Sequence, residues 1–216
     1  MKGKQYLVFG LGRFGTSVAR TLCKLGQEVM AVDRLEEPVK DIAPEVTQAA
    51  QLDATDENAL KSLGITNFDA AVVSIGQNTR DSILVCVLLK ELGIPYLIAK
   101  ANDDLHAKVL QKIGVDRVVF PEREMGTRLA RSIVTPGVLD LMELSEDYQI
   151  IEALPPKDWE GKTLRELNAR KRYGVNVLAI RRGEQFIVAP GADEPFAPGD
   201  QMLALGKRGE MSGLDG

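Results

Sequence analysis

Short runs of β-branched and other apolar residues alternate, along the first half of the chain, with stretches in which apolar residues recur at helical spacing. The first strand is predicted at 6–10 and the first helix at 13–25, and the alternation continues to a sixth strand at 117–120. Between them the pattern predicts strands at 28–33, 47–52, 70–74 and 96–100 and helices at 36–42, 56–63, 78–92 and 104–113. Such a series is typical of a doubly wound parallel sheet with helices on both faces, the Rossmann-type α/β fold.

The pattern changes after Pro121. A further helix is predicted to about residue 134, Thr135-Pro136-Gly137 interrupts it, and an apolar alternation follows at 138–144. The order then becomes a strand (149–154), a helix (163–171) and three short strands (175–181, 185–188 and 201–205). We therefore expect a Rossmann-type domain at 1–134, a linker at 135–145 and a second, smaller α+β domain at 146–216.

Composition narrows the class of protein. The 216 residues carry a net charge of −4, and their cationic side chains are interspersed with acidic ones, so nucleic acid is not an expected partner. The longest apolar run, 83–89, is far shorter than the roughly 20 residues that cross a bilayer, and we see no signal-peptide pattern. These features predict a cytoplasmic protein without direct membrane insertion, in which Cys23 and Cys86 are buried, reduced thiols.

A glycine-rich turn, Gly10-Leu11-Gly12-Arg13-Phe14-Gly15, follows the first predicted strand and opens the first helix. In a nucleotide-binding turn of this type the first glycine permits the tight turn, the second lets the backbone approach a pyrophosphate and the third lets helix and strand pack closely. Asp33 ends the second strand, 33 − 12 = 21 positions after the second glycine, where a carboxylate accepts hydrogen bonds from ribose hydroxyls. The segment therefore predicts an adenine nucleotide without a 2′-phosphate; the alternative is a structural turn with a solvated aspartate.

Two further residues near this turn have both a ligand-binding and a structural interpretation. Arg13 lies at the helix start, where its guanidinium group would reach a terminal phosphate, or it is an ordinary surface arginine. Asp53 and Ala54 follow the third strand, at the edge of the sheet where ligands bind, and would border the adenine. Capping of the next helix by Asp53, Thr55 or Asp56 explains this segment equally well.

The same ambiguity holds at the ends of the fourth and fifth strands. Ser74 and Gly76 are expected beside the cleft, while Asn78 is also a plausible helix N-cap. Lys100 is expected at the same edge, either to counter phosphate charge or as a surface lysine with a buried stem.

Catalytic groups are not evident in the sequence. The single histidine, His106, has a structural or solvated environment as its simplest interpretation, with Asp103 and Asp104 as helix caps. Glu122 and Glu124, in the first turn of the helix after Pro121, complement the helix dipole. Without acid–base machinery for hydride transfer we expect a protein that is not an enzyme. The alternatives are an NAD(H)-binding redox sensor and a small NAD-dependent oxidoreductase.

As a whole, the chain resembles the RCK (KTN/TrkA-type) regulatory subunits of bacterial potassium uptake systems, most closely the Ktr-type gating-ring subunit. The resemblance spans almost the entire chain. It is carried by the glycine-rich turn together with Ala31-Val32-Asp33, Asp53-Ala54-Thr55, Leu88-Leu89-Lys90-Glu91-Leu92, Lys112-Ile113-Gly114-Val115-Asp116-Arg117-Val118 and Pro121-Glu122-Arg123-Glu124-Met125-Gly126.

The resemblance implies a homo-oligomer, dimers assembling into a ring of eight, docked on the cytoplasmic face of a membrane potassium-translocating subunit. ATP and ADP would compete for the Rossmann cleft. Arg13 would reach the terminal phosphate of ATP in a neighbouring subunit's cleft, and Glu122 would help to hold a divalent cation, magnesium or calcium, near that phosphate. The helix that begins at Glu122 carries Met125, Leu129 and Ile133 on an apolar stripe, which would interlock with a partner subunit.

The resemblance also implies a ligand-binding C-terminal domain. Here Arg170 ends a basic helix, Asn176 and Val177 lie on the following strand and Pro190 follows the next one. A two-fold pair of such domains would form a groove suited to cyclic di-AMP. The alternative is that the basic residues complement the helix dipole and that Val177 belongs to the domain's own core.

Overall fold

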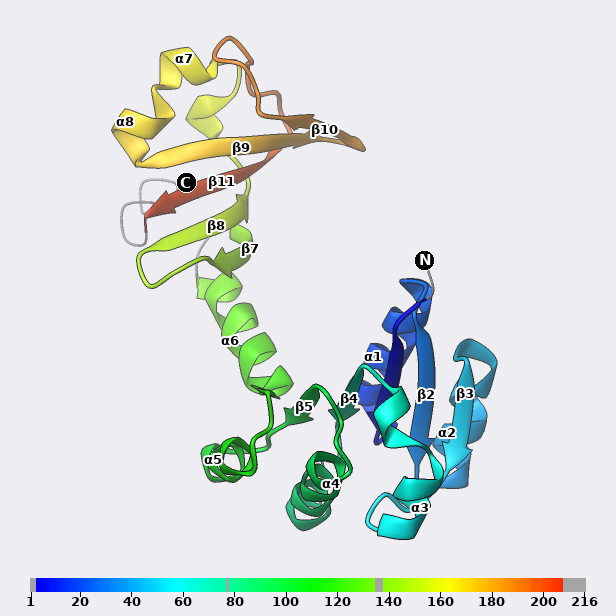
Figure 1. Ribbon diagram of the computed structural model, residues 1–216. Helices are drawn as coiled ribbons and strands as arrows, with labels where there is room; N and C mark the ends of the chain where they lie inside the picture. Colours follow the sequence, from blue (N-terminus) through cyan, green and yellow to red (C-terminus); the bar gives the residue numbers. More distant parts are fainter. Residues whose placement is uncertain (1–2, 77, 135–137, 208–216) are drawn as a thin grey trace. The chain divides into compact units, whose positions relative to one another are not determined.

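The computed structural model describes residues 3–76, 78–134 and 138–207. The chain divides into two compact units, Met1–Glu122 and Arg123–Gly216, each with its own sheet and core (Figure 1). None of the helices within the described residues is both long and apolar enough to cross a membrane.

The first unit contains a six-stranded parallel sheet with strand order β3-β2-β1-β4-β5-β6. Its strands are β1 (Gln5–Phe9), β2 (Glu28–Asp33), β3 (Gln48–Gln51), β4 (Ala70–Val73), β5 (Leu97–Lys100) and β6 (Arg117–Val119). The order reverses between β1 and β4, which pair directly, with Phe9 opposite Val73. A doubly wound sheet binds ligands at such a switch point, and the predicted Rossmann-type fold is confirmed.

Helices cover both faces of this sheet. They are α1 (Arg13–Lys24), α2 (Glu36–Ile42), α3 (Glu57–Ser62), α4 (Thr79–Glu91) and α5 (Asp104–Ile113). Because side chains alternate along β1, Leu7 and Phe9 belong to one core and Val8 to the other. Burying a side chain of this size contributes about 1.5–3 kcal/mol, so the two cores hold the sheet between its helices.

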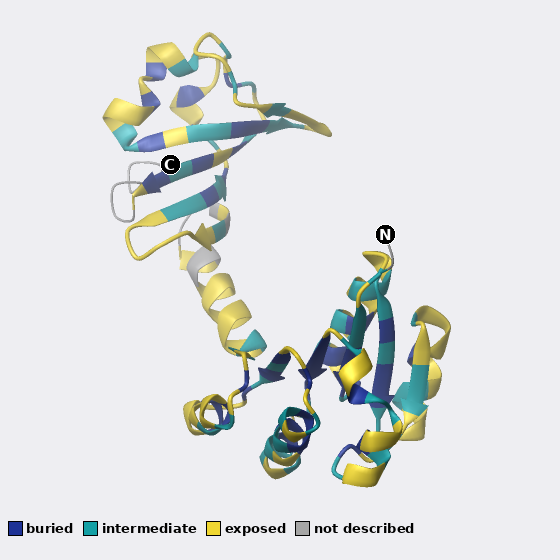
Figure 2. Cartoon of the chain, in the orientation of Figure 1, coloured by how far each residue is buried: buried dark blue, intermediate teal, exposed yellow. Residues whose placement is uncertain are grey.

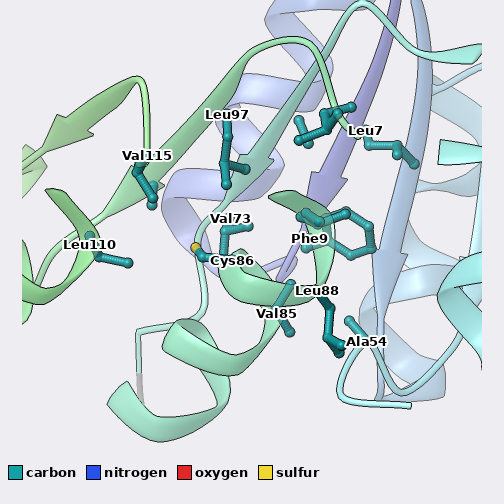
Figure 3. Packing of buried hydrophobic residues seen from close by; sticks show 14 of the residues in the cluster. Leu7, Phe9, Ala54, Val73, Val85, Cys86, Leu88, Leu97, Leu110 and Val115 are labelled. Atoms are coloured by element: carbon teal, nitrogen blue, oxygen red, sulfur yellow. The ribbon is translucent and has the colours of Figure 1, made fainter. Parts of the chain in front are cut away.

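The larger core contains one of the two cysteines. Figure 3 shows Cys86 of α4 beside Val73 of β4, with Phe9 of β1 nearby. Burial raises the pKa of the Cys86 thiol to about 12, so the thiol stays protonated at neutral pH. Both cysteines are free, as expected from the sequence, but Cys23 is only half-buried, so the prediction that both are buried is wrong for Cys23.

The second unit is an antiparallel sheet with helices on one face, the smaller α+β domain that was predicted. Its strand order is β10-β9-β11-β8-β7. The strands are β7 (Val138–Glu143), β8 (Tyr148–Ala153), β9 (Val175–Arg182), β10 (Gln185–Val188) and β11 (Gln201–Lys207). Trp159 and Phe196 are fully buried in its core, with their ring centroids 5.5 Å apart.

The prediction of a single helix at 163–171 is wrong. The structure has two short helices there, α7 (Leu164–Leu167) and α8 (Ala169–Tyr173). Asn168 separates them with a φ of +47°, a left-handed conformation that asparagine tolerates better than most residues. Thr163 and Glu166 form a capping box at the start of α7, and at its end Asn168 N donates to the carbonyl oxygens of Leu164 and Arg165, so local hydrogen bonds fix both ends of this short helix.

The division between the units differs from the expected linker at 135–145. Within that segment β7 pairs with β8, Leu141 lying opposite Ile151, so residues 138–143 are part of the second sheet. Residues 135–137 lie outside the described residues. The boundary also falls before most of α6 (Pro121–Val134), whose residues 122–130 are exposed and belong to none of the three cores (Figure 2).

Candidate functional site

A cleft of about 230 Å³ opens at the carboxyl ends of the first four strands, at the switch point between β1 and β4. Its lining combines backbone of the glycine-rich turn with an apolar wall and a polar rim. The lining residues are Phe9, Gly10, Leu11, Gly12, Val32, Asp33, Arg34, Leu35, Pro38, Leu52, Asp53, Ala54, Thr55, Ser74, Ile75, Gly76, Asn78 and Asp81. The structure thus brings together seven residues predicted from the sequence: Gly10, Gly12, Asp33, Asp53, Ala54, Ser74 and Gly76.

The glycines of the turn serve different purposes. Gly10 has a φ of +87°, which favours glycine. A Cβ atom on Gly15 would lie 1.9 Å from the carbonyl oxygen of Gly10 and 2.4 Å from Ser74 Oγ, so this position has no room for a side chain. A Cβ atom on Gly12 would meet nothing within 4 Å, and the φ of Gly12 is an ordinary −70°. The fold therefore requires glycine at position 15, whereas at position 12 glycine leaves the cleft open.

The cleft meets the N-terminus of α1. Gly12 is the N-cap residue, and the first turn of the helix contains no acidic residue. The first N–H groups of an α-helix lack partners within the helix, and the helix dipole makes this end electropositive. Thr16 donates from its hydroxyl group to the carbonyl oxygen of Leu11 at 2.9 Å, which fixes the turn in front of these N–H groups. The arrangement suits an anionic group.

Asp33 connects the glycine-rich turn to the turn after β2. Its carboxylate accepts hydrogen bonds from Leu11 N at 2.6 Å and from Leu35 N at 2.9 Å, one on each oxygen. Each carboxylate oxygen has a second acceptor position, and the residue lines the cleft. Asp33 is therefore held in place by backbone donors and can still accept hydrogen bonds from a ligand.

The structure separates the alternatives for the segment after β3. Asp56, not Asp53 or Thr55, is the N-cap of α3 and accepts from Asn58 N at 2.8 Å. Asp53 Oδ1 instead accepts from the amide and the hydroxyl group of Thr55, at 2.9 and 2.6 Å. The hydrogen bond from the Thr55 side chain is the main cause that lowers the pKa of Asp53, so this carboxylate is ionised at the rim of the cleft.

Sequence reasoning missed part of the rim. Arg34 lies directly after Asp33, and its guanidinium group is 3.6 Å from the carboxylate of Asp81, in the first turn of α4. Both residues line the cleft. The position of Arg34, directly after a predicted strand, could have indicated that it lies at the ligand-binding edge of the sheet. Its pairing with Asp81 could not be predicted, because the two residues are 47 positions apart and meet only in the folded chain. Asn78 is the N-cap of α4 and also lines the cleft, so both interpretations of this residue hold.

Lys100 and Glu122 form an ion pair at the neighbouring edge, beyond the cleft lining of the described residues. Lys100 Nζ donates to Glu122 Oε1; the lysine side chain is 13% exposed and the glutamate side chain 68%. This hydrogen bond is the main reason that the pKa of Glu122 lies below its usual value, while burial opposes the shift and the charge of Arg13 adds to it. Next to this pair, Asn102 Nδ2 donates to the carbonyl oxygen of Gly76 at 2.8 Å.

Three predicted residues of the turn, Arg13, Phe14 and Gly15, lie outside the cleft lining that the structure describes. Arg13 is exposed at the start of α1, and Phe14 packs against the smaller core of the first unit. His106 is buried: burial lowers its pKa, and its Nδ1 accepts from Asn102 N at 3.3 Å, which supports the structural interpretation. Asp103 is the N-cap of α5, as expected.

Glu122 is the residue to consider for a divalent cation. Among the described residues there is no group of three or more histidine, cysteine, aspartate or glutamate side chains that would hold a metal ion. Magnesium, however, is often held by one or two carboxylates together with the phosphates of a nucleotide. The exposed carboxylate of Glu122 fits that shared type of site.

In the second unit, neighbouring residues of β9 point to opposite faces of the sheet. Val177 packs against the core, as does Val175, whereas Asn176 is exposed. Arg170 is exposed on α8, and Pro190 is half-buried after β10. The side chains of Asn176 and Val177 therefore do not share a face.

Comparisons with known proteins match both units. The TrkA-N domain family matches residues 6–121, and the TrkA-C domain family matches residues 149–214. Ktr system potassium uptake protein C of Bacillus subtilis is 44% identical over 97% of this chain and 95% of that protein. The Ktr system potassium uptake proteins A of Bacillus subtilis and Vibrio alginolyticus are 40% and 37% identical, over 98% and 97% of this chain and 95% of each protein.

Solved structures share the fold. The crystal structure of the GsuK RCK domain aligns with the whole of this chain at a TM-score of 0.70 and 18% identity, covering 47% of its own length. The GsuK channel bound to NAD aligns with the whole chain at a TM-score of 0.69 and 17% identity, covering 40% of its length. A structure of GsuK bound to ADP aligns with 58% of this chain and 33% of its own length, at a TM-score of 0.51 and 19% identity. This chain thus spans less than half of each of these structures.

The two glycines of the turn should respond differently to an added methyl group. We expect Gly15→Ala to lower the free energy of unfolding by about 3 kcal/mol, because its Cβ atom would overlap the Gly10 carbonyl oxygen and force α1 away from β1. Gly12→Ala, the matched control, should change stability by less than about 1 kcal/mol. Urea unfolding followed by circular dichroism measures both. Equal losses in the two variants would show that the helix crossing does not set the stability of the turn.

Proposed function

The chain belongs to the family of RCK regulatory subunits of bacterial potassium uptake systems, composed of a TrkA-N and a TrkA-C domain, and from this premise we propose that it is an ATP- and ADP-binding subunit that gates a membrane potassium transporter. A regulatory role, not a catalytic one, is favoured because the relatives that are 37–44% identical are potassium uptake proteins.

The observation that carries the choice of ligand is the extent of the cleft. Its described lining comes from the ends of β1 to β4 and the start of α4, with no residue from the ends of β5 or β6. In a Rossmann fold this half of the sheet edge holds the adenosine and its phosphates, and a dinucleotide continues over the other half. There, the side chain of Asn102 is hydrogen-bonded to the Gly76 carbonyl oxygen. A mononucleotide such as ATP or ADP therefore fits better than NAD.

The cleft residues have complementary roles in this proposal. Asp33 accepts hydrogen bonds from the ribose hydroxyls, and its negative charge disfavours a 2′-phosphate. The N-terminus of α1, with Gly12 open to the cleft, binds the phosphates, and Ser74 and Gly76 border them. The apolar wall and Ala54 contact the adenine, and Asp53 is an acceptor at its rim.

Two roles depend on a second subunit. Arg13 is exposed and long enough to extend away from its own cleft, so we propose that it contacts the terminal phosphate in a neighbouring cleft. Glu122 would supply one carboxylate to a magnesium or calcium ion that bridges to that phosphate. Met125, Leu129 and Ile133 of α6 are 59%, 58% and 71% exposed, which supports a role for this apolar stripe in holding dimers together within an octameric ring.

The partner proposed for this ring is a membrane potassium-translocating subunit, and the ring would lie on the inner face of the cell membrane. The support is the match of nearly the full chain to Ktr system proteins. The domain boundaries proposed from the sequence, 1–134 and 146–216 with a linker between them, assign most of α6 to the nucleotide-binding half. The compact units would assign it to the other half.

Native mass spectrometry of the nucleotide-free protein, incubated with ATP, ADP or NADP in turn, tests this function. We expect eight chains, each retaining one ATP or ADP and no NADP. Asp33→Asn should keep the subunit number but lower the affinity for both ATP and ADP about tenfold or more, because a charged acceptor for the ribose is lost. Asp69→Asn is the control, since Asp69 also accepts a backbone N–H group, from Gln5, at 2.8 Å. Retention of NADP as good as that of ATP would contradict the proposal.

Arg13→Ala should separate ATP from ADP. If the guanidinium group contacts only the terminal phosphate of ATP, the variant should bind ATP about tenfold more weakly and ADP almost unchanged. Isothermal titration calorimetry in the presence of magnesium measures both affinities. Arg20→Ala, on the same helix but paired with Glu45, is the matched control. Equal losses of ATP and ADP would contradict the assigned contact.

For the second unit we propose cyclic di-AMP as a ligand, bound by a two-fold pair of chains. The support is the exposure of Arg170 and of Asn176, while Val177, whose side chain faces the core, would contribute its backbone and Pro190 would border the site. Calorimetry on the full chain should give one cyclic di-AMP per two chains. Binding should be lost in Asn176→Ala and kept in Arg165→Ala, whose arginine pairs with Asp193. Absence of binding to the folded wild-type protein would refute the site.

A further inference from the structure

The ammonium group of Lys100 lies where the cleft, β5 and the start of α6 meet. A Cβ atom on Gly76 would lie 3.5 Å from Lys100 Nζ, and Gly76 is part of the cleft lining. Ser74, two residues earlier, donates from its hydroxyl group to the carbonyl oxygen of Gly10 at 2.5 Å, which ties this strand end to the glycine-rich turn. Lys100 therefore presents its positive charge beside the part of the cleft that faces the N-terminus of α1.

The two members of the Lys100–Glu122 pair differ in their freedom to move. The lysine side chain is 13% exposed, so its stem is enclosed by the protein. The glutamate side chain is 68% exposed on the first turn of α6, where water can replace the lost partner. An ion pair with such an exposed carboxylate contributes little to stability. The pair can therefore open by movement of Glu122 alone, while the ammonium group stays beside Gly76.

A terminal phosphate would compete with Glu122 for this ammonium group. A terminal phosphate carries more negative charge than a carboxylate and offers three acceptor oxygens, so it forms stronger charge-assisted hydrogen bonds. Burial of the lysine stem strengthens its interaction with whichever anion lies closest, because the local dielectric constant is lower than in water.

We propose that Lys100 is a phosphate-sensing residue, which pairs with Glu122 while the cleft is empty and with the terminal phosphate once a nucleotide is bound. This inference rests on the proposed nucleotide binding and adds a coupling between phosphate binding in the cleft and the state of Glu122 on α6. The exchange releases Glu122, which becomes available to a divalent cation, and it changes the charge balance at the first turn of α6. Occupation of the cleft by phosphate is thereby communicated to the helix that leads out of the first unit.

Zero-length cross-linking with a carbodiimide tests the exchange directly. The reagent reaches the exposed carboxylate of Glu122 and joins it to a paired lysine as an amide, which tandem mass spectrometry of proteolytic peptides detects. We expect a Lys100–Glu122 cross-link in the nucleotide-free protein, reduced at least fivefold by saturating ADP in EDTA, and unchanged by adenosine. The pair Lys90–Asp116, with its Nζ and Oδ2 atoms 2.9 Å apart, is the control within the same chain and should cross-link equally in all samples.

Calorimetry on the same samples separates the possible failures. Binding of ADP with an undiminished Lys100–Glu122 cross-link would overturn the exchange and leave the nucleotide function standing, whereas a chain that binds no adenine nucleotide would overturn both. Lys100→Met should lower the affinity for ADP about tenfold and leave the affinity for adenosine unchanged, while Lys90→Met should change neither affinity. An equal loss of affinity for ADP and for adenosine in Lys100→Met would assign Lys100 a purely structural role.

Discussion

The crossing of α1 over the start of the β1–α1 turn is the constraint on which the first unit depends. Gly15 brings the helix so close to the Gly10 carbonyl oxygen that no Cβ atom fits, and the hydroxyl group of Ser74 binds the same oxygen. The β1–α1 turn, α1 and the end of β4 therefore meet at one carbonyl group, although β4 is distant from the other two in sequence. As a result the N-terminus of α1 points at the edge of the sheet where β1 and β4 part, and the cleft lies there and not elsewhere along the edge.

Negative and positive charges lie at different parts of this cleft. Asp33 is fixed by two backbone donors, and Asp53 by Thr55, so both carboxylates are held ready at the rim. The opposing positive charges are the helix N-terminus and Lys100, whose ammonium group is already paired with Glu122. A ligand with a polar, hydroxyl-rich middle and an anionic end satisfies both sets, which is the physical case for a nucleotide with a short phosphate chain.

The second unit is stabilised by a different balance of forces. Its core is built around Trp159 on one face of the sheet, and Asp200, fully buried, accepts from Arg182 and from Ala197 N at 2.9 and 2.8 Å. A buried carboxylate with a paired guanidinium group holds the start of β11 in one arrangement, since breaking such a pair is costly. The other face of β9 carries Asn176, so that face is available for an interaction that the core does not use.

Most of the fold was determined by the sequence alone, because strand and helix periodicity and the spacing between the glycine turn and Asp33 are local signals. The same signals failed at Asn168, where a single left-handed residue ends one helix and begins another. Only the tertiary structure decided which polar residues meet. Arg34 pairs with Asp81, Lys100 with Glu122 and Asn102 with Gly76 because parallel strands bring distant strand ends to one edge. No local pattern records these pairings, since the partners are separated by whole strands and helices.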